Sequence, residues 1–360
     1  MSDIKLLING NEYTGWEDLS LSRSIEALAG AFSLKVSELV PLPIESGDKC
    51  ELFLLDKKVL TGWVDSVTAT ADSGNHSIEI SGRDLTGDLV DCAAKNESQE
   101  FTNIPFVKLI QAICEPFQIE TLIIEPEGGF DPFKKFALMQ ETAWEAIERA
   151  CRLRGVFAGT TPDGVLIIQE YGLGRAASGF KLGDNLLSAS ATFDLKDRFS
   201  EIKVYGQQPG DDDSDEKTAA SVQGVARDPN IKRYRPLIVM AESQVNNKVA
   251  QLRAEWEVAV RAARGTVISC EVQGWEQAPG RLWVINEIAN FDAPALGVKN
   301  DLLIKEVEYK SSNSGTTTAF TLTRADAYKK QPDLDEDKAT GLKKGKGDDG
   351  TVLVWKDNPE

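Results

Sequence analysis

The sequence predicts a mainly β protein with α+β parts, in which two similar β-barrel domains are combined with helix-containing domains. Two regions, residues 1–95 and about 265–330, consist of short apolar–polar alternations separated by turns, a pattern typical of barrels and sandwiches. Between these regions the apolar residues recur every three or four positions, which predicts helices. The length of 360 residues fits about two to four domains of roughly 100–200 residues each.

The first region, 1–95, is predicted to form the first barrel. Residues 4–8 alternate and precede the turn Asn9-Gly10-Asn11, and Phe32, Leu34 and Val36 share one face of a later strand. Further strands are expected at 16–25, 50–55, 59–67 and 77–81.

Residues 96–180 are predicted to form a small α+β domain. Helical spacing of apolar residues predicts helices over 105–117 and 142–154, and Gly155 follows the second as a stop signal. The sequence Thr161-Pro162-Asp163-Gly164 predicts a hairpin turn between two strands.

The second barrel is expected to be discontinuous, formed by 181–208 and 265–330 and interrupted by an insertion over 209–264. The insertion carries an acidic loop, 209–216, and an amphipathic helix over 241–264. Strands are expected at 267–272, 282–286, 302–309 and 317–323, and 331–360 is expected to be a mobile tail. Residues 48–90 and 267–326 repeat one strand order, with Trp63 and Trp283 in similar places.

Composition excludes several classes of protein. The formal charge of -17 disfavours tight binding to nucleic acid or to an anionic membrane. No apolar run approaches the ~20 residues that a membrane-spanning helix needs, and the N-terminus has no signal-peptide pattern. The five cysteines are scattered and form no Cys-x-x-Cys pair, which predicts reduced thiols.

Motifs for catalysis are missing from the sequence. A zinc hydrolase needs two or three histidines, but the chain has only His76, which lies in a polar turn. No Gly-x-Ser-x-Gly turn supports a serine nucleophile, and Gly172 and Gly174 lack the third glycine of a dinucleotide site. The aspartates 211–213 lack the spacing of a calcium loop. We therefore predict no enzyme activity, no cofactor and no metal site.

Several separate segments, taken in order, resemble the Mu-like phage tail P protein, a baseplate hub family also called the late-control D-like group. The resemblance covers about residues 1–330, and the segment 82–92 is its most specific part. The segments that carry it are 22–34, 62–67, 76–84, 86–93, 235–239, 254–257, 272–275 and 282–286.

This resemblance implies a virion structural protein of a contractile tail, assembled in the host cytoplasm. The assembly that it implies is a homotrimeric ring that joins a sixfold tail tube to a threefold spike and leaves a channel for DNA. The implied partners are the tail tube, central spike and baseplate wedge proteins, with no membrane-spanning segment and no sequence-specific DNA contact. Trp63, Asp91, Trp275 and Trp283 are candidate anchors of an oligomer interface or of the barrel cores.

Two other functions stay open. A tail-associated peptidoglycan hydrolase would need a pair of acidic residues in a cleft, and the many carboxylates of this chain do not exclude one. The hub part of a phage-like injection or secretion spike is the second alternative. That class usually continues into a long β-helical spike, which residues 331–360 do not resemble.

Overall fold

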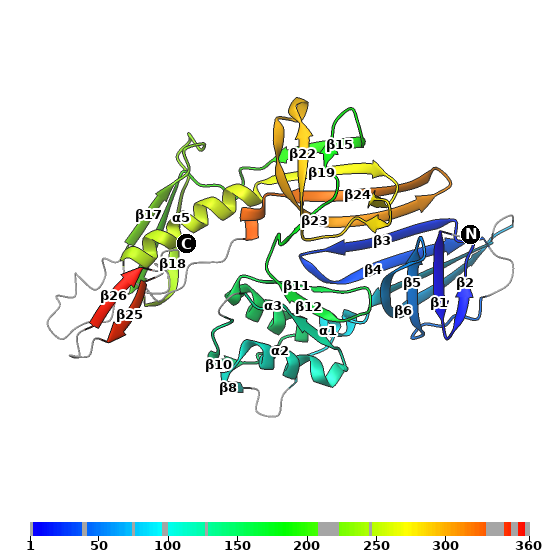
Figure 1. The fold of residues 1–360 in the computed structure, drawn as a ribbon, viewed down its shortest axis with the longest axis horizontal. Helices are drawn as coiled ribbons and strands as arrows, with labels where there is room; N and C mark the ends of the chain where they lie inside the picture. The colour runs from blue at the N-terminus through cyan, green and yellow to red at the C-terminus, as the bar shows by residue number, and fades with distance from the viewer. Residues whose placement is uncertain are drawn as a thin grey trace. The chain divides into compact units, whose positions relative to one another are not determined.

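A computed structural model describes residues 3–37, 42–73, 76–95, 100–126, 129–207, 223–244, 247–328, 342–346 and 352–356. The chain divides into two compact units (Figure 1). The first comprises Met1–Ala191 and Ile268–Thr323, and the second comprises Thr192–Val267 and Arg324–Glu360. Strands predominate over helices in the described residues, so the predicted mainly β class is confirmed.

The N-terminal strands of the first unit form what we call the first β module. Alternation places every second side chain in the core, as in β1, where Ile4, Leu6 and Ile8 are buried. The strands pair in the order β3-β4-β7-β6-β5-β1-β2. Their bounds are β1 Ile4–Ile8, β2 Asn11–Tyr13, β3 Asp18–Ser24, β4 Ala27–Val36, β5 Lys49–Leu54, β6 Lys57–Ala71 and β7 His76–Asp84.

The C-terminal strands of the first unit form the second β module. Its main strands pair in the order β15-β19-β24-β23, and β22 pairs with β23, β13 and β14. The bounds are β13 Gly174–Arg175, β14 Phe180–Lys181, β15 Leu186–Phe193, β19 Thr266–Gln273, β20 Glu276–Ala278, β21 Arg281–Leu282, β22 Glu287–Ala293, β23 Val298–Ser312 and β24 Gly315–Thr323, with the 3-10 turn η2 at Pro294–Leu296.

The two modules share one topology. The order β3-β4-β7-β6-β5 of the first module corresponds to β15-β19-β24-β23-β22 of the second, with the strands in the same sequence order. The turn Ile25–Glu26 joins β3 directly to β4, whereas a long segment of the second unit separates β15 from β19 in the sequence. The prediction of two similar strand-rich domains is therefore confirmed.

The hairpin of β6 and β7 in the first module matches the hairpin of β23 and β24 in the second module residue by residue. Each has a bulge in its first strand, after which Ser66 pairs with Ser81 and Glu306 pairs with Thr321. Counterparts are thus 240 positions apart along both strands. The counterpart of Trp63 is Leu303, whereas Trp283 lies between β21 and β22. The predicted match of Trp63 with Trp283 is wrong, because the bulge and the turn set the register.

A direct strand pair joins the modules. Strands β23 and β3 are neighbours in the sheet (Figure 1). Residues 306–311 of β23 run antiparallel to 19–24 of β3, and Tyr309 lies opposite Leu21. Both side chains are buried in one apolar cluster that contains residues of both modules. The two modules therefore share a continuous sheet.

A small α+β domain follows the first module. Helices α2 and α3 pack with strands β9, β11 and β12 around a second core cluster. Helix α3 begins with a capping box between Thr142 and Glu145 and ends at Gly155, which has a left-handed φ of 68°. The bounds are α1 Gly87–Asp91, β8 Glu100–Ile104, α2 Phe106–Cys114, η1 Glu115–Phe117, β9 Thr121–Ile123, β10 Phe133–Ala137, α3 Ala143–Arg154, β11 Phe157–Thr160 and β12 Leu166–Gln169.

The second unit contains a three-stranded sheet in the order β17-β16-β18 with helix α5 packed on it. The contact is close at Gly224, where an added Cβ would lie 2.2 Å from the backbone of Ala250. The bounds are β16 Glu201–Gln207, β17 Gln223–Arg227, β18 Pro236–Gln244, α5 Asn247–Arg264, η3 Ala325–Tyr328, β25 Leu342–Lys346 and β26 Val352–Lys356.

The local predictions for the chain meet mixed outcomes. The two helices of the α+β domain and the hairpin turn at Thr161–Gly164 are confirmed. The helix predicted over 241–264 starts only at Asn247, because β18 continues to Gln244. The strand predicted over 282–286 is wrong: β21 ends at Leu282, and Asn286 has a positive φ of 66°.

Strand β16 lies in the range 181–208, which the sequence analysis assigns to the second barrel, but it pairs with β17 and β18. The acidic loop 209–216 lies outside the described residues. In the tail, β25 pairs antiparallel with β26. The exact domain boundaries stay predictions.

Candidate functional surface

The sheet shared by the modules has one apolar and one polar side. Successive side chains of a strand point to opposite sides, and residues paired across strands point to the same side. Val307, Tyr309 and Phe320 therefore face the core, whereas Glu306, Glu308 and Thr321 lie on the outer side. We call this outer side the polar sheet face, formed by Ser20, Ser33, Glu79, Ser188, Ser190, Ser269, Glu271, Glu306, Glu308, Thr317 and Thr321.

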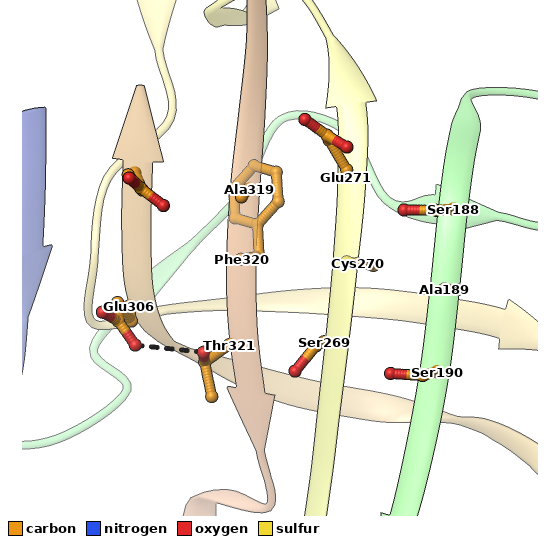
Figure 2. Close-up of a pocket in the computed structure, with 11 residues that line it drawn as sticks. Ser188, Ala189, Ser190, Ser269, Cys270, Glu271, Glu306, Ala319, Phe320 and Thr321 are labelled. Atoms are coloured by element: carbon orange, nitrogen blue, oxygen red, sulfur yellow. Dashed lines mark hydrogen bonds between the residues drawn. The ribbon is translucent and has the colours of Figure 1, made fainter. Parts of the chain in front are cut away.

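The second module hollows this face into a shallow depression. Figure 2 shows Ser188 and Ser190 on β15, Ser269 and Glu271 on β19, and Thr321 on β24. The Thr321 hydroxyl donates to Glu306 at 3.0 Å, drawn as the dashed line in Figure 2. The depression is thus lined mainly by hydroxyls and carboxylates.

Cross-strand hydrogen bonds continue along the face into the first module. Thr317 Oγ1 donates to Glu271 at 2.6 Å, and Ser20 Oγ of the first module donates to Glu308 of the second at 2.9 Å. Ser33, which pairs with Ser20, donates to Glu79 at 2.9 Å. The polar sheet face is therefore one surface across both modules.

The chemistry of this face suits low adhesion to anions. Lys310 also lies there, but its Nζ is 3.0 Å from Glu308, so its charge is compensated. Tight binding to a phosphate backbone needs clustered Arg and Lys side chains, and stacking on bases needs exposed aromatic rings. Arg83 lies on the same side of β7 as Glu79 and is paired with Asp65 and Asp91, and Trp63 opposite it is half-buried. The described part of this face therefore has no cluster of uncompensated basic side chains.

Two of the four predicted anchors lie in the core of the second module. Trp283 is 2% exposed and stacks on Phe180 with 4.9 Å between ring centroids, with Phe320 edge-on at 5.0 Å. The Tyr309 hydroxyl donates to the Trp283 carbonyl, and burial raises the pKa of Tyr309. Trp275 is also buried and donates from Nε1 to the carbonyl of Lys310 at 2.9 Å.

The other two anchors lie at the first module. Trp63 is half-buried on β6, opposite Arg83 of β7. Asp91 is exposed at the end of α1 and is held by Arg83 at 2.6 Å, which also binds Asp65 at 2.8 Å. The bond from Arg83 lowers the pKa of Asp91. Whether any of the four anchors contacts another subunit stays a prediction.

Sequence reasoning missed a buried polar network between the first module and the α+β domain. Asp84 is 1% exposed and accepts hydrogen bonds from Gly30 N at 2.8 Å and Thr86 Oγ1 at 2.6 Å. Arg23 lies 3.4 Å from Asp84 and donates to the carbonyl of Thr160 at 2.8 Å. Burial raises the pKa of Asp84, partly opposed by Arg23.

The signal for this network was present in the sequence. Arg23 and Asp84 both lie in segments that carry the family resemblance, and Asp84 and Thr86 fall within its most specific part. A charged residue inside a strand pattern that is otherwise apolar on one face is the feature that could have identified them.

Family profiles match successive parts of the chain. Residues 3–84 match the N-terminal domain of Mu phage baseplate assembly protein GpP-like proteins, and 86–170 match the second domain of baseplate hub protein gp44-like proteins. Residues 198–256 match the third domain of NMB1110-like tail proteins, and 246–331 match the fourth domain of Mu phage baseplate assembly protein GpP.

Individual proteins agree with these matches. The chain is 33% identical over 316 residues to the baseplate hub protein gp44 of Escherichia phage Mu, covering 84% of this chain and 83% of that protein. The 43 kDa tail protein of prophage MuSo2 from Shewanella oneidensis superposes with a TM-score of 0.81 at 28% identity, covering 91% of this chain and 99% of the other. The tail protein from Neisseria meningitidis MC58 shares the fold, with a TM-score of 0.77, 21% identity and coverage of 91% and 98%.

The duplicated β modules and the matched domains define a phage tail protein of the baseplate class. More particularly, this chain belongs to the Mu-like phage baseplate hub family, together with gp44 of phage Mu. The family predicted from the sequence is therefore confirmed. No helix in the described residues has the length and apolar character needed to cross a membrane.

Proposed function

We propose that this protein is the hub of a contractile tail baseplate and acts by assembly rather than by catalysis. Three copies form a ring in which each contributes two β modules, so six similar modules surround the axis. The ring joins the sixfold tail tube to the threefold spike. It is part of the virion and is assembled in the host cytoplasm.

The duplication of the β module carries this proposal. Two modules of one topology, joined edge to edge by β23 and β3, give one chain two similar faces for a sixfold partner. A ring of three such chains has exact threefold symmetry. Because each chain contributes two modules of the same strand topology, the backbone of the ring has approximate sixfold symmetry. Closed rotational symmetry also makes the assembly self-limiting.

The proposed partners follow from this geometry. The tail tube protein binds one side of the ring, the central spike protein binds the other, and baseplate wedge proteins contact its outside. DNA passes through the central channel without sequence-specific binding. We assign the channel wall to the polar sheet face, because its hydroxyls and carboxylates favour slippage of DNA over adhesion.

Particle symmetry tests the ring directly. We expect the purified chain to sediment at micromolar concentration as a species of three times its 39.4 kDa mass. Electron micrographs should show a threefold particle with a central hole. A monomer across that concentration range, or a particle without a hole, would refute the proposed function.

Charge reversal tests the channel wall. Replacing Glu271, Glu306 and Glu308 by Lys should slow DNA delivery by assembled particles, and the defect should ease at higher salt. The matched control is Glu115→Lys, an exposed position in the α+β domain. Unchanged delivery by the triple variant, in particles that assemble normally, would remove the polar sheet face from the channel.

The two alternative functions predict different results. A tail-associated hydrolase would clear bacterial cell walls, so an assay of the purified chain on peptidoglycan separates it from a structural hub. The hub of an injection or secretion spike would share the ring. It would instead be recovered with a secretion apparatus rather than with phage particles.

A further inference from the structure

The second unit contains a positively charged segment within a strongly acidic chain. Residues 223–267 include eight Lys and Arg residues and four Asp and Glu residues, so their formal charge is +4, whereas the whole chain has a formal charge of -17. A local reversal of the sign of the charge attracts a partner of the opposite sign. This segment therefore favours an acidic partner.

Helix α5 covers one side of the sheet β17-β16-β18 (Figure 1). Val239 of β18 packs against the apolar cluster that contains Val249 and Ala250 of α5. Successive side chains of a strand point to opposite sides, so Ile238 and Met240 point away from the helix. Both are 62% exposed. The side of the sheet opposite α5 is therefore apolar and exposed along β18.

The neighbouring strands extend this exposed side. Ile238 pairs with Lys203 of β16, Met240 pairs with Tyr205, and Val225 of β17 pairs with Lys203 from the other edge. Residues paired across strands lie on the same side of a sheet. We call this surface the β18 face, formed by Lys203, Tyr205, Val225, Ile238 and Met240. It combines aliphatic side chains with a tyrosine ring and a lysine.

The loop before β18 contributes an aromatic ring and two uncompensated charges. Tyr234 is 88% exposed, and its neighbours Lys232 and Arg233 are exposed as well. Neither Lys232 nor Arg233 forms an ion pair with another residue that the structure describes. Their charges are therefore available to a partner.

Lys203 connects this loop to the β18 face. Its hydrogen bond to Glu201 is the main cause that raises the pKa of Lys203, and Tyr205 and Tyr234 add smaller electrostatic contributions. Tyr234 therefore lies near Lys203. Glu201 also pairs with Arg227 at 2.8 Å, so a single carboxylate is shared by two cations. The loop and the β18 face thus form one surface that is both apolar and basic.

The backbone of β18 offers a strand edge beside this surface. Strand β18 ends the sheet and pairs with β16 alone among the described residues. Its residues 237–241 read Leu-Ile-Val-Met-Ala and carry no charge, although natural edge strands are usually protected by charged residues. A strand that adds to such an edge gains main-chain hydrogen bonds and places alternate side chains on each side of the sheet.

We propose that the edge of β18 binds an extended segment of a separate acidic protein, which adds a strand to the sheet β17-β16-β18. Apolar side chains of the added strand lie beside Ile238 and Met240, and carboxylates at its end contact Lys232 and Arg233. The inference goes beyond the proposed ring, because the β modules belong mainly to the first unit and β18 belongs to the second.

A protein strand fits this surface better than a phosphate ligand does. Ile238 and Met240 have no polar group for a phosphate oxygen, and apolar side chains are the partners that they favour. A free strand edge presents alternating N–H and C=O groups, and another extended backbone satisfies both kinds along its length. The basic loop residues then select an acidic strand over a basic one.

Peptide binding to the full chain tests the proposal. The probe is a fluorescein-labelled peptide, Glu-Glu-Glu-Val-Thr-Val-Thr-Val-Glu-Glu-Glu, with acidic residues at both ends so that it fits in either strand direction. We expect it to bind at least about tenfold tighter than the same peptide with Lys in place of Glu. It should also bind at least about tenfold tighter than a version N-methylated at both threonines, which lacks two main-chain donors. Fluorescence anisotropy measures all three, and no binding by the acidic probe would overturn the proposal.

Substitutions separate the apolar contribution from the charged one. Ile238→Ser combined with Met240→Ser should weaken probe binding by at least about tenfold, because it removes the apolar contacts. Lys232→Glu combined with Arg233→Glu should weaken it by a similar factor, and high salt should reduce that difference. The matched control is Leu153→Ser, a 49% exposed aliphatic position in α3, which should bind like the unchanged chain. Equal binding by all variants would contradict the proposed surface.

Further measurements distinguish the occupants. Amide hydrogen exchange of residues 237–241 should slow when the probe binds, and unchanged exchange there would overturn the pairing with β18. Binding of duplex DNA or phosphatidylglycerol vesicles in place of the probe, lost on charge reversal of the loop, would assign the surface to phosphate groups instead. Loss of the trimer in the Ile238 and Met240 variant would assign it to a second copy. A monomeric unchanged chain that still binds the probe would refute the ring and leave this inference intact.

Discussion

The two β modules share a strand order but differ in what completes them. In the second module, residues 306–311 of β23 pair with β3, whereas the equivalent residues 66–71 of β6 have no strand partner on that edge among the residues that the structure describes. The cores differ too. The second is built around Phe180 stacked on Trp283 with Phe320 edge-on to both, whereas the first is built mainly of aliphatic side chains together with Phe32 and Trp16. A duplicated topology therefore leaves room for each copy to take a separate role.

The difference between the two cores predicts the largest change in the free energy of unfolding. Trp283→Ala should lower the free energy of unfolding by about 3–5 kcal/mol, because it removes a fully buried ring from the aromatic cluster. Trp63→Ala removes a half-buried ring and should cost about 1–2 kcal/mol. Urea unfolding followed by circular dichroism measures both. Equal losses would mean that the modules depend on their tryptophans alike.

Substitutions at the C-terminal ends of β7 and β24 should differ in their effect on the free energy of unfolding by a somewhat smaller amount. Asp84→Ala leaves Arg23 unpaired in a buried network and should cost about 3 kcal/mol. Its counterpart in the second hairpin is Arg324, whose ion pair with Asp326 is partly exposed. Arg324→Ala should change stability by less than about 0.5 kcal/mol. A large loss for Arg324→Ala, in the same urea titration, would contradict this contrast.

The buried cysteines of the two modules should have the same low reactivity toward thiol reagents. Each module buries one cysteine, Cys50 in the first and Cys270 in the second, and burial raises both pKa values to about 12. Very little thiolate is then present at pH 8, so neither should react with a thiol reagent. Of the five cysteines Cys92 is the exposed one, and the native protein should titrate one thiol. Urea should release all five, and early reaction of Cys50 alone would indicate local opening of the first module.

Local patterns predicted the elements well where one sequence signal decided them. Helix α3 has its capping residue, its apolar stripe and its terminal glycine within one stretch of chain, and the structure places it at Ala143–Arg154. The helix predicted from residue 241 was too long, because residues 241–244 continue a strand whose partner β16 is distant in the sequence. The strand or helix propensity of a segment gives no information about a partner that is distant in the sequence.

The candidate surface was harder to predict than the elements. Serine, threonine and glutamate alternate along many strands, and no single strand marks them as one face. Their union into the polar sheet face depends on the pairs β23–β3 and β4–β7, which bring together residues far apart in the chain. Arg23 and Asp84 likewise meet only in the folded protein.

The β class, the repeated strand pattern and the acidic charge could be predicted from the sequence, because alternation, turns and composition are local properties, and the ordered segments that resemble the hub family predicted the family. The register of the two hairpins, the buried Arg23–Asp84 pair and the pairing of the strand edges came only from the fold. These depend on pairing between distant segments. A bulge that shifts one strand by a single residue reverses which side chains face the core.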